Sequence, residues 1–197
     1  MFFSLTQTRI ALLALFDVKE RNVISPKKFK EAILFMENFH FAYTAICSKR
    51  ANQLDNIYSN FAISLRKSTD KQQTNKILEE QLYDSLNKIY PTYDEFNAKF
   101  INLSYSKDSK QDKQENMKTK YAINKLSEYF EECDHFDSDG SIEHIYPEGT
   151  GVAKSINIGN LILLEFNLNN KASNLSYNDK KKIYTNSKYN WIRVVNK

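Results

Sequence analysis

A glutamate and a histidine stand side by side at Glu143 and His144, in the stretch SIEHIYP of this 197-residue chain. A free imidazole titrates near neutral pH, so His144 is the candidate for a general base that takes a proton from water. The Glu143 carboxylate and the carbonyl oxygen of an asparagine side chain would supply hard oxygen ligands, which Mg²⁺ prefers. Water and phosphate would complete the coordination shell of the ion. These residue types predict the hydrolysis of a phosphodiester bond with one divalent metal ion.

Two short strands and a helix must position these groups. The segments 141–147 and 157–166 are β-branched and apolar and are bounded by turn residues, which predicts two strands. Residues 176–192 then predict a helix with Ser176 as its N-cap, which completes a ββα unit. Neighbouring side chains on a strand point to opposite faces, so a bulge or the metal geometry must turn the carboxylate toward the histidine.

Turns in this region are marked by glycine. All four glycines of the chain lie in or next to this region: Gly140 before the first predicted strand, Gly149 and Gly151 between the strands, and Gly159 near the start of the second. We expect them to turn the chain so that the acid, the histidine and two asparagines converge on one ion.

Four ordered motifs carry a resemblance to a known family: IEHIYP at 142–147, IGNLILL at 158–164, LNN at 168–170 and YNDKKKIYTNS at 177–187. Together they resemble the HNH, or His-Me finger, nuclease domain of the GmrSD type. That domain is found in type IV, modification-dependent restriction enzymes and in related anti-phage proteins. The motifs cover the last quarter of the chain.

The resemblance implies a role for each matching residue. Glu143 would be the metal-ligating acid and His144 the general base. Asn160 would be the catalytic-site asparagine that braces the loop and holds the histidine, and Asn169 would contribute to the metal site. Many HNH nucleases have aspartate in place of Glu143 and histidine in place of Asn169.

Basic residues are concentrated at the end of the sequence. From residue 171 to residue 197 there are seven basic residues against one acid. Such a segment suits a phosphate backbone, and a solvated lysine face is the alternative. The resemblance implies that Lys180 above all, with Lys171 and Lys181, faces the phosphates of DNA.

The preceding sequence predicts helices. Residues 1–139 contain no glycine and only two prolines, which indicates about five or six helices before residue 135. Ser25–Pro26 has the form of a helix start, and Thr92 to Glu95 has the form of a capping box. We therefore predict a mainly α protein with a helical region at 1–135 and a ββα-metal nuclease unit at 136–197.

Several features are interpreted without a catalytic role. The apolar run at 1–16 lacks the features of a signal peptide and is too short for a bilayer, so it predicts a core helix and no membrane. Two distant cysteines encode neither a disulfide framework nor a zinc site and favour the cytoplasm. His40 fits a core position, and residues 104–120 predict an exposed loop or a frayed helix start. An EF-hand-like run at 135–146 lacks the ligands for calcium, so His135 is interpreted as a turn residue.

The predicted function is a metal-dependent endonuclease or nickase that cuts DNA with Mg²⁺, for which Mn²⁺ can substitute, as the effector of a restriction or anti-phage system. The alternative is a catalytically weak or inactive DNA-binding or regulatory module on the same scaffold. Family members usually carry a ParB-like nucleotide-hydrolysing domain that senses modified DNA, and no phosphate-cradling glycine loop precedes residue 140. We therefore expect that sensor on a separate chain or a removed segment. No heptad pattern fixes an oligomeric state.

Overall fold

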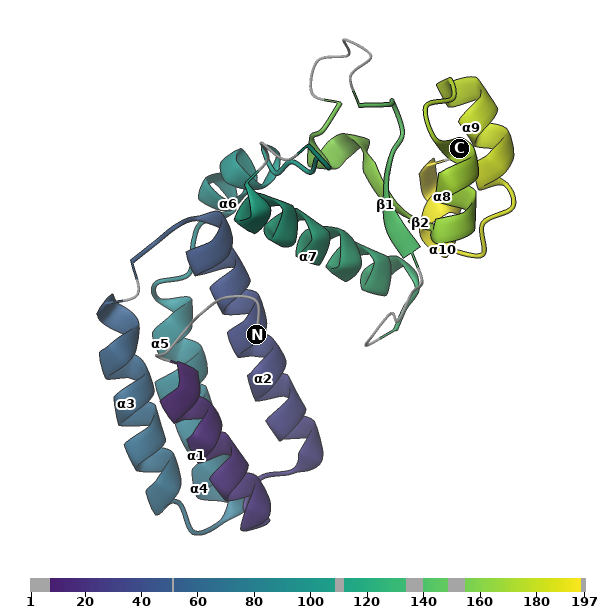
Figure 1. Ribbon diagram of the computed structural model, residues 1–197. Helices are drawn as coiled ribbons and strands as arrows, with labels where there is room; N and C mark the ends of the chain where they lie inside the picture. Colours follow the sequence, from purple (N-terminus) through teal and green to yellow (C-terminus); the bar gives the residue numbers. More distant parts are fainter. Residues whose placement is uncertain (1–7, 51, 109–111, 134–139, 149–154, 196–197) are drawn as a thin grey trace. The chain divides into compact units, whose positions relative to one another are not determined.

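The computed structural model of the chain describes residues 8–50, 52–108, 112–133, 140–148 and 155–195 (Figure 1). By its internal contacts the chain divides into two compact units, residues 1–99 and residues 100–197. The boundary between residues 135 and 136, drawn from the motifs, stays a prediction.

The first unit is entirely helical in the residues described. Its elements are α1 (Thr8–Glu20), α2 (Pro26–His40) continued by the π-helical η1 (Phe41–Ile46), α3 (Asn52–Lys67), α4 (Lys71–Ile77) continued by the π-helical η2 (Leu78–Tyr83) and α5 (Asp84–Asn87), and α6 (Tyr93–Phe100).

The predicted helix starts are confirmed. Ser25 Oγ accepts a hydrogen bond from the Lys28 N–H at 3.2 Å, directly before Pro26. At α6 the capping box is reciprocal: the Glu95 N–H donates to Thr92 Oγ1 at 3.2 Å, and the Thr92 N–H donates to Glu95 Oε2 at 3.0 Å. Each side chain thereby satisfies one of the N–H groups that the first turn of a helix leaves free.

The core of this unit forms where α1 packs against α3. Leu15 and Phe61 are completely buried. The apolar N-terminal run is a core helix in its described part, and among the residues described no helix is long and apolar enough to cross a bilayer. His40 is buried too, 2.7 Å from the Tyr58 hydroxyl, and burial lowers its pKa to about 4. The core assignment of His40 is confirmed.

The second unit contains a small sheet surrounded by helices. Its elements are α7 (Lys113–Phe130), β1 (Gly140–His144), the 3₁₀ turn η3 (Ile158–Asn160), β2 (Leu161–Glu165), α8 (Phe166–Ala172), α9 (Tyr177–Tyr184) and α10 (Asn190–Val195). The fold prediction is confirmed: the protein is mainly α, with two strands followed by helix near its C-terminal end.

The predicted element boundaries differ in three places. The first strand ends at His144, three residues before its predicted end. The second strand is shorter than expected, because η3 precedes it and α8 follows it. The predicted helix 176–192 is two helices, with a turn after α9 that is held by Glu165, whose carboxylate accepts from Ser187 Oγ at 2.8 Å and from the Lys188 N–H at 2.7 Å. These contacts join residues more than 20 positions apart, so local sequence could not reveal them.

The sheet places the two motif residues at its end. β1 and β2 are antiparallel, with Glu143 opposite Ile162 and His144 opposite Leu161. The first four residues of β2 are all buried, because α7, α8 and α10 all pack against β2. A strand covered on both faces reads as a continuous apolar run, as LILL does here.

Candidate active site

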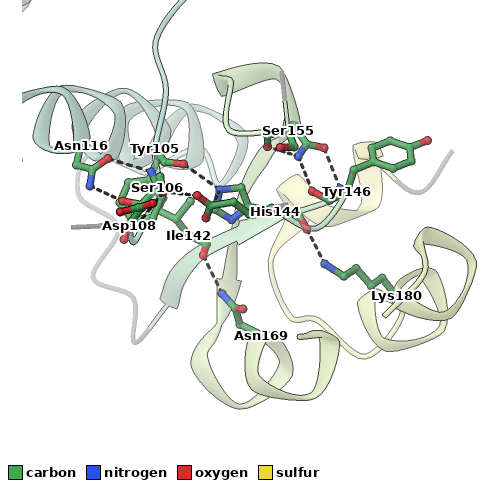
Figure 2. A network of polar contacts seen from close by, with 12 residues as sticks. Tyr105, Ser106, Asp108, Asn116, Ile142, His144, Tyr146, Ser155, Asn169 and Lys180 are labelled. Atoms are coloured by element: carbon green, nitrogen blue, oxygen red, sulfur yellow. Dashed lines mark hydrogen bonds and ion pairs between the residues drawn. The ribbon is translucent and has the colours of Figure 1, made fainter. Parts of the chain in front are cut away.

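His144 is the last residue of β1, and a backbone carbonyl holds its ring. Nε2 lies 2.9 Å from the Tyr105 carbonyl oxygen (Figure 2), and the side chain is only 11% exposed. A carbonyl can only accept, so Nε2 carries the proton of the neutral ring. Nδ1 is then left as a proton acceptor, as a general base requires.

The segment that carries Tyr105 is tied to the site from two sides. Tyr105 donates its N–H to the Ile156 carbonyl at 2.8 Å, beside a β-bridge between Ser104 and Asn157. Asn116, in the first turns of α7, receives the Ser106 N–H at 3.1 Å and donates to the Ser106 carbonyl at 2.6 Å. The carbonyl that holds His144 is therefore itself held in place.

The prediction of an exposed loop or a frayed helix start at 104–120 is confirmed only in part: half of the described residues are exposed, but two are buried. Ser106 and Thr119 are buried, and α7 begins at Lys113. The polar side chains that suggested solvent exposure instead bind backbone: the Thr119 hydroxyl donates to the Ser104 carbonyl at 2.7 Å. Polar composition alone does not distinguish a solvated loop from one whose polar groups are satisfied internally.

Glu143 points to α9, away from the ring of its neighbour. Its Oε1 accepts from Lys180 Nζ at 2.7 Å and from the Tyr184 hydroxyl at 3.0 Å. The Lys180 ammonium also donates to the His144 carbonyl at 2.6 Å. Burial, followed by the charge of Glu143, raises the pKa of Tyr184, so its hydroxyl remains a donor at working pH.

Lys180 is not where the resemblance implied. The expectation that it faces DNA phosphate is wrong in this structure, because its side chain is completely buried. Lys180 and Tyr184 are four residues apart on α9 and so lie on the same face, the one turned to β1. An ammonium that is buried this way is stable only beside a carboxylate, and Glu143 provides it.

Asn169 lies on α8, against the backbone of β1. Its Nδ2 donates to Ser141 Oγ at 2.7 Å and to the Ile142 carbonyl at 3.0 Å (Figure 2). This fixes the orientation of the amide, and Oδ1 accepts no hydrogen bond from the described residues.

One pocket of about 240 Å³ gathers the predicted groups. Its lining residues are Lys107, Ile142, Glu143, His144, Pro147, Glu148, Asn169, Asn170, Ser173 and Asn174. The structure therefore brings together Glu143 and His144 of β1 and Asn169 of α8. Glu143 and His144 reach the same pocket although their side chains leave β1 on opposite faces.

The chemistry of this donor set fits Mg²⁺. Glu143 Oε2, like Asn169 Oδ1, accepts no hydrogen bond from the described residues, so both oxygens are uncommitted. In the part of the chain that the structure describes, no three His, Cys, Asp or Glu side chains gather as a metal cluster. An ion here would depend on one carboxylate, one amide, water and phosphate, a set that Mg²⁺ accepts because it retains several waters.

Asn160 contacts the loop after β1 and not the imidazole. Its Oδ1 accepts the Tyr146 N–H and its Nδ2 donates to the Tyr146 carbonyl, both at 2.9 Å, and Nδ2 also donates to the Ser155 carbonyl. The side chain thus closes the loop between the two strands. Its assignment to catalysis stays a prediction.

The two remaining lysines lie elsewhere on the unit. Lys171 is exposed in the last turn of α8, and Lys181 is half-buried with its ammonium 5.5 Å from the centre of the Tyr177 ring. The predicted contact of both lysines with DNA stays a prediction.

Two charged residues of the pocket were missed from the sequence. Glu148 Oε2 lies 3.9 Å from His144 Nε2, and its Oε1 accepts from the Ser106 hydroxyl. Lys107 is the cation of the pocket lining. The position of Glu148 directly after the proline of the first motif was a usable signal, whereas Lys107 is 37 residues from His144 and had none.

Some predicted features lie outside the described residues. These are His135, the EF-hand-like aspartates at 137 and 139, and the glycines at 149 and 151.

More than half of the chain matches a known family. Residues 90–196 match the family described as GmrSD restriction endonucleases, C-terminal domain. A search of curated proteins finds no match. The matched segment contains every residue of the pocket and covers more than half of the chain. The protein therefore belongs to the GmrSD restriction endonuclease family, through the C-terminal, nuclease-type domain of those enzymes.

Proposed function

We propose that this domain hydrolyses DNA phosphodiester bonds with bound Mg²⁺, as an endonuclease or nickase of the HNH type. The observation that carries the proposal is the geometry of His144: Tyr105 binds Nε2, so Nδ1 is the free acceptor, in a pocket shared with Glu143 and Asn169. Membership of a restriction endonuclease family supplies the substrate class.

The reaction begins when His144 Nδ1 takes a proton from water. The water oxygen attacks phosphorus, the bond from phosphorus to the leaving sugar oxygen breaks, and that oxygen takes a proton from solvent. When bound, the metal ion would offset the negative charge that develops on the phosphate and on the leaving oxygen. Glu143 Oε2 and Asn169 Oδ1 would hold it, and the Lys107 ammonium favours an anionic substrate.

The test is incubation of the chain with supercoiled plasmid in Mg²⁺ or Mn²⁺, beside an EDTA control. His144→Ala should lower the rate of nicking at least about 100-fold, the lower end of what a general base contributes. Asn124→Ala, an exposed change on α7, is the matched control and should cut normally. Cutting by His144→Ala at the rate of the control would refute the assignment of the base.

A second candidate is a DNA-binding or regulatory module with weak or absent catalysis. The observation in its favour is that Lys180 and Tyr184 already satisfy Glu143 Oε1 without a metal ion. This candidate predicts a gel shift without metal-dependent nicking, whatever residue stands at 144.

We further propose a role in restriction of foreign DNA, with recognition supplied by a sensor domain on a partner chain or a separate segment. Addition of such a partner to a chain that binds but does not cut plasmid should start the cutting.

A further inference from the structure

Two tyrosines stack beside the site without a role in it. The rings of Tyr146 and Tyr177 lie with centroids 5.5 Å apart and planes at 27°, and the ammonium of Lys181 lies 5.5 Å from the Tyr177 centroid. Tyr146 remains 46% exposed. We call Tyr146, Tyr177 and Lys181 the tyrosine platform.

The platform is held rigidly. Asn160 binds both the N–H and the carbonyl of Tyr146 at 2.9 Å, and the following Pro147 is buried. Tyr177 is the first residue of α9, directly after the N-cap Ser176. A ligand that stacks on rings fixed in this way loses little conformational entropy to binding, because the protein is already ordered.

The tyrosine platform lies close in the chain to His144, the residue proposed to act at the scissile bond. Tyr146 is two residues from His144, so their Cα atoms are within about 7 Å of each other. Figure 2 shows the Tyr146 ring pointing away from the histidine, off the polar network. A phosphate at the His144 pocket would therefore have its neighbouring nucleotide beside the platform.

We propose that the tyrosine platform binds an unpaired nucleobase next to the phosphate that is cut. In duplex DNA the faces of each base are covered by its neighbours, so only a base that is single-stranded or turned out of the helix can stack on Tyr146. Lys181 adds a cation for the adjoining phosphate. This inference rests on the proposed function as a DNA nuclease and specifies its substrate as DNA with a locally unstacked base.

The test measures binding of fluorescein-labelled oligonucleotides by anisotropy, with the full chain in EDTA so that no cutting occurs. Three probes of one length are compared: a single strand, the same strand as a duplex, and a single strand built of abasic residues. Tyr146→Ala should weaken binding of the single strand about 5- to 100-fold, the range for loss of one stacked base. Binding of the duplex and the abasic strand should stay within about twofold.

Two variants control for folding and for the ring itself. Tyr146→Phe keeps the stacking face and should bind the single strand as the unchanged chain does. Tyr129→Ala removes a tyrosine that is 76% exposed on α7 of the same unit and should have no effect.

Two results would overturn the inference. The first is equal binding of the single strand by Tyr146→Ala and Tyr129→Ala, and the second is an equal loss on the abasic strand. Either result leaves the nuclease proposal intact if the unchanged chain still cuts plasmid. Failure of the unchanged chain both to bind any probe and to cut would refute both proposals.

Discussion

At the scale of single residues, the site depends on a buried ion pair. Glu143 and Lys180 are 4% and 0% exposed, and their 2.7 Å contact places an ammonium directly behind the acid that would hold the metal ion. Many HNH nucleases, which the motifs of this chain resemble, have an aspartate in place of Glu143. The longer glutamate has one more rotatable bond, and Lys180 and Tyr184 restrict it by binding the same oxygen.

Replacement of Lys180 by methionine should therefore be costly. It leaves a buried carboxylate without its cation, and loss of one partner of such a pair typically destabilises a protein by about 3–5 kcal/mol. Trp191 is the single tryptophan of the chain and packs against Phe130 in the second unit, so its fluorescence in urea reports the unfolding of that unit.

The double variant Glu143→Gln with Lys180→Met separates charge from packing. Without either charge, most of the lost stability should return. Lys188→Met is the matched change at an exposed lysine of the same unit and should shift the free energy of unfolding by less than about 0.5 kcal/mol. A double variant as unstable as Lys180→Met would show that the ion pair is not what stabilises this contact.

At the scale of elements, α7 positions the histidine through an intermediate segment. Asn116 fixes Ser106, and the neighbouring Tyr105 carbonyl fixes the ring of His144. A helix that precedes the motifs by more than ten residues therefore belongs to the site.

Asn116→Ala should lower the rate of plasmid nicking about 10- to 100-fold, since small displacements of a catalytic group have effects of this size. The urea concentration at the midpoint of unfolding, followed by Trp191 fluorescence, should change little, because Asn116 lies in the first turns of α7. Asn124→Ala on the same helix is the control. An unchanged rate in Asn116→Ala would mean that Tyr105 holds its position without α7.

The helices and strands could be predicted from local sequence signals, but the contacts between these elements could not. The Ser25–Pro26 start, the capping box at Thr92 and the N-cap Ser176 each rest on bonds within three residues, so the sequence displays them. The two strands were likewise predicted from local sequence, as short runs of β-branched and apolar residues. Lys180 illustrates the limit: on the sequence it is one of three consecutive lysines, and only packing of α9 on β1 decides that this one is buried.

At the scale of the whole molecule, one buried histidine should make the stability of the first unit depend on pH. His40 lies in the core of the first unit, with an uncharged partner in Tyr58, and its pKa falls from 6.5 to about 4 on folding. Protons therefore bind the unfolded state first as pH falls. The stability that His40 contributes is complete above pH 6.5 and is lost progressively toward pH 4.

Between pH 7 and pH 5 this group should lower the free energy of unfolding by about 2 kcal/mol. His40→Gln keeps a polar partner for Tyr58 but does not titrate, so its stability should fall less over the same interval. Urea unfolding followed by far-UV circular dichroism at both pH values gives the comparison. Parallel pH dependence in the two proteins would mean that His40 titrates normally.

The contacts of Lys180 and Tyr184 with Glu143 also determine when, during synthesis of the chain, the proposed site can first form. The Tyr105–His144 contact spans 39 positions and the Lys180–Glu143 contact spans 37. Contacts between residues so far apart in the sequence form slowly, because the chain between them must first close into a loop. A ribosome releases His144 well before Lys180 and Tyr184. While synthesis continues, Tyr105 is already present to bind His144, but Glu143 lacks the two α9 side chains that bind its Oε1, so the acid of the proposed site is positioned only once α9 has docked.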